Sequence, residues 1–274
     1  MDAFESAGHS VIAAPAAAAP DDLTKAFENY RGAVDAVAIA GGDGTLFFAA
    51  AAIRALGVPL LVVPLGTINE LARTLEIPLD IAPACALIDT GRTHSIDLGV
   101  VNGRYFFNEA SMGLSTHVAR AQNEQLKSVW GMLAIPVATL RSLGWMRPHH
   151  FDVETERGPR AFSTVQLTVA NSNRFGGIVE NADASLEDGR LDLYSVDVRD
   201  WHDVVAIALA IVRRHFPEAH CVTDLRGTRF VVRSHSRHAV FADGEPASFT
   251  PAEFTIAPRA VEVYVPAPVA QKSE

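Results

Sequence analysis

The sequence predicts an N-terminal α/β domain with a parallel sheet, followed by a mainly antiparallel β-sandwich domain. Apolar runs at residues 34–40 and 59–63 are continuous, which is typical of parallel strands buried on both faces. Helical segments follow both runs, and alternation of strands with helices favours a parallel sheet. The pattern then changes to short strand-like runs separated by Asn-Gly and Asp-Gly turns. We therefore place a boundary near His94, between domains of residues 1–94 and 95–274.

The first domain is expected to contain short helices and three strands. Gly8, Gly57 and Gly91 each follow a helical segment, as glycine commonly does at a helix C-terminus. The expected helices are residues 2–7, 21–30, 46–56, 70–75 and 82–90, and the expected strands are residues 11–14, 34–40 and 59–63.

The second domain is expected to be built from strands that two helices interrupt. The expected strands are residues 95–101, 104–108, 151–155, 162–170, 191–196, 230–234, 238–241 and 261–265. The expected helices are residues 126–143 and 204–215.

Composition narrows the class of protein. The chain has 274 residues, of which 49% are hydrophobic and 20% charged, as in a globular protein with a substantial core. Its net charge of -9 argues against a nucleic-acid partner, since such a protein usually needs a basic surface. Two cysteines, Cys85 and Cys221, do not form a disulfide framework, so we expect a cytoplasmic protein. No apolar run reaches the roughly 18 residues of a transmembrane helix, and no oligomeric state is indicated.

A glycine-rich motif, GGDGT, occupies residues 41–45 between a predicted strand and a predicted helix. Glycines let backbone N–H groups approach a phosphate, and a helix N-terminus favours its negative charge. Asp43 would repel a phosphate, so in such a loop it would act through Mg²⁺ or a water molecule bound to it. Thr45 can hydrogen-bond a phosphate or cap the helix. A tight turn without a ligand is the alternative interpretation.

A second motif, PLGTIN at residues 64–69, follows the next predicted strand. Gly66 and Thr67 form another small loop at the carboxyl end of a parallel strand, where open α/β sheets bind their ligands. Two such loops on neighbouring strands support a phosphate site more strongly than one does.

Together with two later motifs, these loops carry a family resemblance. GGDGT and PLGTINELAR (residues 64–73) resemble the diacylglycerol kinase catalytic family, which includes bacterial lipid kinases and sphingosine kinases. NAD kinases and phosphofructokinases share the first motif and the fold that it implies. ADGE at residues 242–245 resembles the family's Asp-Gly-Glu motif, and DASLEDG at residues 183–189 resembles its metal loop.

The resemblance implies an ATP- and Mg²⁺-dependent kinase that phosphorylates a lipid hydroxyl at a membrane surface. Asp243 would be the general base, with Glu245 beside the nucleotide and its metal. The nucleotide site would be formed by Gly41, Gly42, Asp43, Gly44, Thr45, Gly66, Thr67, Asn69 and Gly244. A structural Mg²⁺ would be bound by Asp183, the Leu186 carbonyl and Asp188. A separate, water-mediated Mg²⁺ network would include Glu70 and Asp97 together with Asp43. We expect the protein to associate peripherally with the inner face of the membrane.

Simpler interpretations of two motifs stay open. Asp243 and Gly244 form an Asp-Gly pair, which is a common hairpin turn without any catalytic role. The acidic segment 183–189 is equally compatible with a solvated loop.

The chain departs from the family pattern in two ways. Met1 falls in what resembles the helix after the family's first phosphate loop, so the first βα unit is expected to be missing. Glu70 stands where the family usually has aspartate, which places the carboxylate one methylene farther out.

Two alternative functions stay open. One, which the missing βα unit suggests, is a catalytically impaired homologue that binds a lipid or a partner. The other is a kinase of a soluble substrate such as NAD, an interpretation that depends on GGDGT alone.

Overall fold

The computed structural model describes residues 2–14, 20–113, 148–172, 174–175, 179–180, 184–198, 202–203, 206 and 221–267. The chain forms two compact units, and each is described by itself. Unit 1 comprises Met1–Ile96 and Arg259–Glu274, and unit 2 comprises Asp97–Pro258. The helix expected at 126–143 lies outside the described residues, as does nearly all of the one expected at 204–215.

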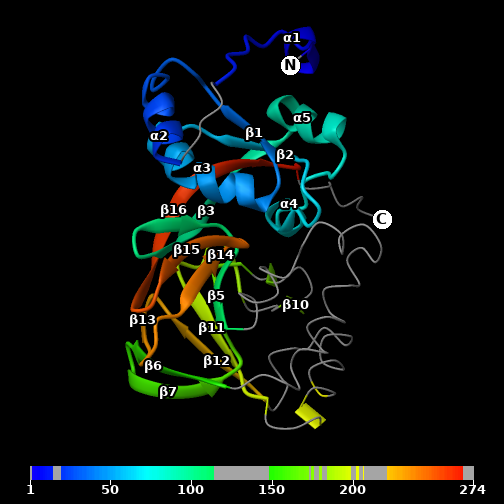
Figure 1. Cartoon of the computed structure of the whole chain (residues 1–274). Coiled ribbons are helices and arrows are strands. Elements are labelled where there is room, and N and C mark those ends of the chain that lie inside the picture. The colour runs from blue at the N-terminus through cyan, green and yellow to red at the C-terminus, as the bar shows by residue number, and fades with distance from the viewer. Residues whose placement is uncertain are drawn as a thin grey trace, which may run out of the picture. The chain divides into compact units, whose positions relative to one another are not determined.

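Unit 1 is an α/β unit around β1 and β2, which form the parallel end of an eight-stranded mixed sheet (Figure 1). Strands β1 and β2 pair in parallel, and Val263 of β16 pairs in parallel with Leu60 of β2. Helix α2 packs on α3, α3 on β1, and α5 on β2. The elements are α1 (Asp2–Ser6), α2 (Pro20–Glu28), β1 (Val37–Gly41), α3 (Asp43–Leu56), β2 (Leu60–Pro64), α4 (Glu70–Thr74), α5 (Ile81–Thr90), the start of β3 (Arg92–Val101) and the end of β16 (Ala252–Val265).

The parallel sheet predicted from the sequence is confirmed, and two local expectations were wrong. All residues of β2 are buried, which accounts for its uninterrupted apolar run. Helix α3 begins at Asp43, three residues before the expected start, because the Gly42 carbonyl accepts hydrogen bonds from Thr45 N (3.0 Å) and Leu46 N (3.2 Å). Residues 11–14 are irregular instead of forming a strand, since they pair with no strand in the described part of the chain.

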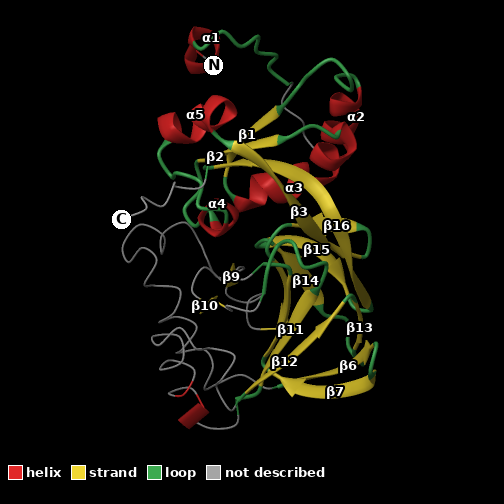
Figure 2. Cartoon of the chain, turned by 180° about the vertical axis from the view of Figure 1, so that it is seen from behind, coloured by secondary structure: helices red, strands yellow, loops and turns green. Residues whose placement is uncertain are grey.

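Unit 2 contains an antiparallel six-stranded sheet in the order β12-β11-β8-β5-β14-β15. Four of its strands, β11, β12, β14 and β15, are labelled in Figure 2. Its strands are β5 (Glu109–Gly113), β8 (Gln166–Ala170), β11 (Leu191–Val196), β12 (Val222–Gly227), β14 (Ala239–Ala242) and β15 (Glu245–Phe249). A separate short pair is formed by β9 (Arg174–Phe175) and β10 (Val179–Glu180).

A second antiparallel layer completes the unit. Strand β16 pairs with β13, β13 with β6, and β6 with β7, while β3 pairs with β4 and β16. The remaining strands are β4 (Arg104–Phe106), β6 (His149–Thr155), β7 (Gly158–Thr164) and β13 (Arg229–Arg233). The β-rich second domain predicted from the turn-separated strands is thereby confirmed. Phenylalanine side chains fill much of its core, with Phe106, Phe107, Phe151, Phe230 and Phe254 almost fully buried.

Strand boundaries in unit 2 differ from the expected ones where the chain changes sheets. The single strand expected at 162–170 is two strands, because β7 pairs with β6 whereas β8 pairs with β5 and β11. The last strand begins at Ala252, not at 261, and it passes through Pro258. Its pairing explains this length, since Ala252–Thr255 pair with β13 and Val263 pairs with β2.

In the described part of the chain, no helix has the length and apolarity to cross a bilayer.

Candidate functional site

The two glycine motifs meet at the carboxyl ends of β1 and β2. Gly41 and Pro64 are paired in the parallel register, and Leu65 N donates a hydrogen bond to the Gly41 carbonyl (3.0 Å). The chain leaves both strands at this edge, where open α/β sheets bind their ligands. The structure therefore brings together the loops that the sequence marks as phosphate-binding.

The loops approach so closely that glycine is required on both sides. A Cβ atom added at Gly66 would lie 2.6 Å from the Cα of Gly42, which is closer than real Cβ atoms approach other atoms. One added at Gly42 would lie 3.0 Å from the Cα of Gly66. Packing of backbone against backbone is thus one reason for these glycines, in addition to any phosphate contact.

Asn69 holds the second loop in its conformation. Gly66 N donates to Asn69 Oδ1 (2.8 Å), and Asn69 Nδ2 donates to the Gly66 carbonyl (2.8 Å). Asn69 has a φ of 51°, in the left-handed region that asparagine tolerates better than most residues. This exchange gives Asn69 a loop-fixing role that does not depend on a ligand.

Asp43 links the first motif to the start of α4. Its Oδ1 accepts hydrogen bonds from Glu70 N (2.8 Å) and Leu71 N (3.4 Å). Asp43 belongs to α3, and its carboxylate thus caps the N-terminus of a different helix, α4. Glu70 itself is buried, with 8% of its surface exposed. Two carboxyl-bearing residues thus lie together beside the glycine loops, and carboxylate oxygens are the ligands that Mg²⁺ prefers.

Two substitutions at Asp43 distinguish the contribution of helix capping to stability from the contribution of the negative charge. Asp43→Ala is expected to lower the free energy of unfolding by about 1 kcal/mol, because the first amides of α4 lose their acceptor. Asp43→Asn keeps an acceptor oxygen and should retain most of that stability, while losing the charge. Urea unfolding of both variants beside the unmodified protein makes the comparison. Equal destabilisation by both substitutions would contradict the capping role.

The N-terminus of α3 lies within the first motif. Gly42 occupies the N-cap position, and no side chain caps the helix there. The first amides of a helix carry partial positive charge and bind phosphates. A phosphate beside Gly42 and Gly44 would take the place of the missing side-chain cap.

In unit 2, Asp243 and Gly244 form the hairpin turn between β14 and β15. Their φ values are 47° and 83°, and Ala242 pairs with Glu245 across the turn. Positive φ at both central residues is the signature of the type I′ hairpin turn. The simpler interpretation of this Asp-Gly pair is therefore correct for the backbone.

The side chain of Asp243 does more than the turn requires. Its Oδ2 accepts a hydrogen bond from Phe107 N (2.7 Å), and its Oδ1 accepts from Asn108 N (2.8 Å) and Glu109 N (3.2 Å). Backbone donors of this kind fix the orientation of a carboxylate. Glu245 begins the next strand, partly exposed, on the other side of the turn.

Two buried asparagines near Asp243 carry no motif signal in the sequence. Asn171 Nδ2 donates to the carbonyls of Asp97 (3.0 Å) and Phe107 (2.8 Å), and Asn171 N donates to the Asn108 carbonyl (2.8 Å). Asn108 and Asn171 are 1% and 2% exposed. Asn171 directly follows β8 and Asn108 directly precedes β5, and a polar residue at a strand end is the signal that could have marked them.

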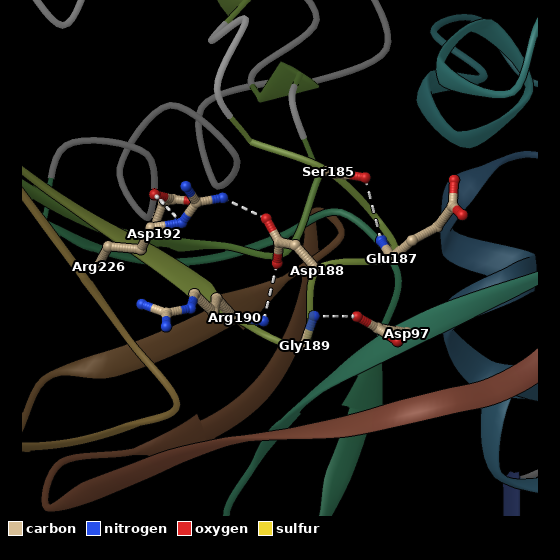
Figure 3. A network of polar contacts seen from close by, with 8 residues as sticks. All are labelled: Asp97, Ser185, Glu187, Asp188, Gly189, Arg190, Asp192 and Arg226. Atoms are coloured by element: carbon tan, nitrogen blue, oxygen red, sulfur yellow. Dashed lines mark hydrogen bonds and ion pairs between the residues drawn. The ribbon is translucent and has the colours of Figure 1, made fainter.

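The predicted metal-loop residues lie in a network of polar contacts (Figure 3). The Leu186 carbonyl accepts from Asp97 N (2.7 Å), and Asp97 Oδ2 accepts from Gly189 N (2.7 Å). Asp188 Oδ1 accepts from Arg190 N (2.8 Å). Asp183 lies outside the described residues. Asp97 therefore braces this loop, and its predicted network with Asp43, which belongs to unit 1, stays a prediction.

The fold of both units matches known protein families. Residues 2–101 match the diacylglycerol kinase catalytic domain, and residues 108–265 match the YegS C-terminal NAD kinase beta sandwich-like domain. Diacylglycerol kinase of Bacillus subtilis (strain 168) is 30% identical over 271 residues, covering 97% of this chain and 89% of its own. Diacylglycerol kinase of Staphylococcus aureus (strain Newman) is 28% identical over 242 residues, covering 87% and 76%.

Solved structures show the same architecture. A crystal structure of a diacylglycerol kinase from Bacillus anthracis str. Sterne has a TM-score of 0.72 at 22% identity, covering 90% of this chain and 83% of that one. Another structure from the same organism has a TM-score of 0.76 and covers 92% and 85%. The architecture is thus that of an α/β unit joined to an NAD kinase-like β-sandwich. The chain belongs to the diacylglycerol kinase catalytic-domain family, a family of kinases.

Proposed function

We propose that this protein is an ATP- and Mg²⁺-dependent lipid kinase that phosphorylates a hydroxyl of diacylglycerol or a related lipid. Family membership supports phosphoryl transfer, and the names of its relatives support a lipid acceptor. The observation that carries the proposal is the contact of the two glycine loops at the start of α3. There Gly42 and Gly66 meet backbone to backbone, beside helix amides that no side chain caps.

Unit 1 would hold the nucleotide. Amides of the loops and of the first turn of α3 would bind its phosphates, as glycine-rich loops before helices do in other nucleotide-binding proteins. Asp43 and Glu70 offer carboxylates for Mg²⁺ directly or through water, which fits the hard-oxygen preference of that ion. When bound, Mg²⁺ would neutralise charge on the phosphates during transfer.

Unit 2 would supply the general base of the reaction, Asp243. Asp243 orients the acceptor hydroxyl and takes its proton while the hydroxyl oxygen bonds to the γ-phosphorus and the bond to the β-phosphate oxygen breaks. The products are ADP and a phosphate monoester. Three backbone amides hold the Asp243 carboxylate in place, which suits phosphoryl transfer because the chemistry depends mostly on positioning and electrostatics.

The test is a phosphorylation assay with radiolabelled ATP and MgCl₂. Dioleoylglycerol, a long-chain base and NAD serve as parallel acceptors, and omission of each acceptor is the control. We expect labelled lipid product that disappears in EDTA. Labelling of NAD in place of the lipids would instead indicate a kinase of a soluble substrate. Absence of turnover together with absence of Mg-ATP binding by calorimetry would overturn the proposal.

A further inference from the structure

Arg226 forms a cationic bridge between two carboxylates of unit 2. Its Nη2 atom forms an ion pair with Asp188 Oδ2, and its Nε lies 3.6 Å from Asp192 Oδ1. Arg226 and Asp192 are directly opposite each other in the β11–β12 register, where opposite charges stabilise a sheet. The bridge is sheltered, since the side chains of Asp188 and Asp192 are 23% and 11% exposed.

The bridge occupies the loop to which family resemblance assigns a structural Mg²⁺. Within the ranges that the structure describes, no three His, Cys, Asp or Glu side chains gather in a way that could hold a metal ion. Asp188 Oδ1 already accepts from Arg190 N, and its Oδ2 faces Arg226 (Figure 3). The Leu186 carbonyl already accepts from Asp97 N. Asp183, the third residue of the assigned metal site, lies outside the described residues, and the described atoms direct their contacts to Arg226 and to backbone amides.

We propose that the guanidinium of Arg226 supplies the positive charge of this loop in place of a metal ion. A guanidinium offers several N–H donors in a fixed plane and stays charged at any physiological pH, so it can hold two carboxylates without a cofactor. The loop of residues 184–190 is then ordered by the protein alone.

The bridge is connected to Asp243 through a chain of hydrogen bonds. Gly189, next to the paired Asp188, donates to Asp97 Oδ2, and the Asp97 carbonyl accepts from Asn171 Nδ2. Asn171 also donates to the carbonyl of Phe107, whose amide donates to Asp243 Oδ2. Arg226 is thereby a positioning residue for Asp243, and this part of the inference rests on the proposed function.

The experiment uses the nucleotide-free full chain and compares Arg226→Gln and Arg226→Lys with the unmodified protein. Thermal unfolding is measured in EDTA and in millimolar MgCl₂. Arg226→Gln is expected to lower the unfolding temperature by about 3 °C in both solutions. Trypsin cleavage after Arg190, followed by mass spectrometry, should be equally slow in both solutions and faster in Arg226→Gln. Arg226→Lys should restore part of each loss.

Arg229→Gln is the matched control. Arg229 pairs with Glu253 on the other layer, with side chains that are 53% and 51% exposed, so its loss should leave the unfolding temperature and cleavage unchanged. Slower cleavage after Arg190 in MgCl₂ than in EDTA, or an Arg226→Gln variant that matches the unmodified protein, would overturn the proposal. Activity is read separately, with a lower kcat at unchanged KM for Mg-ATP expected in Arg226→Gln. If no variant phosphorylates lipid, the unfolding and cleavage results still decide the role of Arg226.

Discussion

Asp243→Asn is expected to lower kcat by about 10²–10⁴-fold, because the acceptor hydroxyl loses the group that takes its proton. The affinity for Mg-ATP should not change, since the proposed nucleotide loops belong to unit 1. Steady-state kinetics with dioleoylglycerol, together with calorimetry of Mg-ATP binding, measures both quantities. An unchanged kcat would exclude Asp243 as the base.

The backbone of the turn should accept this substitution without strain. Asn102 and Gly103 adopt φ values of 47° and 84° in another hairpin of the same chain, nearly those of Asp243 and Gly244. The hydrogen bonds should change, because an amide can accept on only one of its two polar atoms. The amide of Phe107 would lose its acceptor, at a cost of about 1–2 kcal/mol in the free energy of unfolding. Urea unfolding therefore accompanies the kinetics, so that a change in kcat is compared at temperatures where the variant is folded.

Gly66→Ala is expected to lower kcat/KM for Mg-ATP by about 100-fold, because the added methyl would push the two phosphate loops apart. The new Cβ would lie 2.6 Å from Gly42 Cα and 2.7 Å from Asn69 Oδ1, so it also disrupts the hydrogen bonds that hold the second loop. Overpacking of this kind costs about 1–3 kcal/mol in the free energy of unfolding. Kinetics at varied Mg-ATP and urea unfolding measure the two effects.

A matched glycine gives the control for this substitution. Gly227, like Gly66, has no positive φ, but a Cβ added there would come no closer than 3.3 Å to the ring of Phe230. Gly227→Ala should therefore leave kcat/KM for Mg-ATP within about threefold of the original. A Gly66→Ala protein that binds and uses Mg-ATP as well as Gly227→Ala does would show that the loops tolerate separation.

Sequence patterns predicted the structure correctly where it depends on residues that are close together in the sequence. The continuous apolar runs before Gly41 and Pro64 predicted parallel strands, and their parallel pairing is confirmed. Strand β16 was mostly missed, because Pro258 lies within it and prolines argue against a continuous strand. Its two halves are held by different partners, β13 and β2, and no local pattern records such distant pairing.

The same limit applies to the candidate site. Motifs identified Asp43, but capping of α4 by its carboxylate joins residues 27 positions apart. The hydrogen bond from Gly189 to Asp97 spans 92 positions, and the ion pair of Arg226 with Asp188 spans 38. An arginine in a strand has no distinguishing sequence signal, so its role is visible only once the strands are paired. The assignment of Asp188 to a metal comes from family resemblance and stays a prediction, whereas its ion pair with Arg226 is visible only in the structure.

The course of the chain limits how unit 1, the proposed nucleotide-binding unit, can be exchanged among relatives. Unit 1 is discontinuous, and Val263 of its returning strand lies beside Leu60 of β2. A fragment ending at Ile96 would leave that side of a fully buried strand without its partner, and such bare edges promote aggregation. Chimaeric kinases made by module swapping therefore need two junctions, one within β3 and one within β16, so that the graft carries its own closing strand.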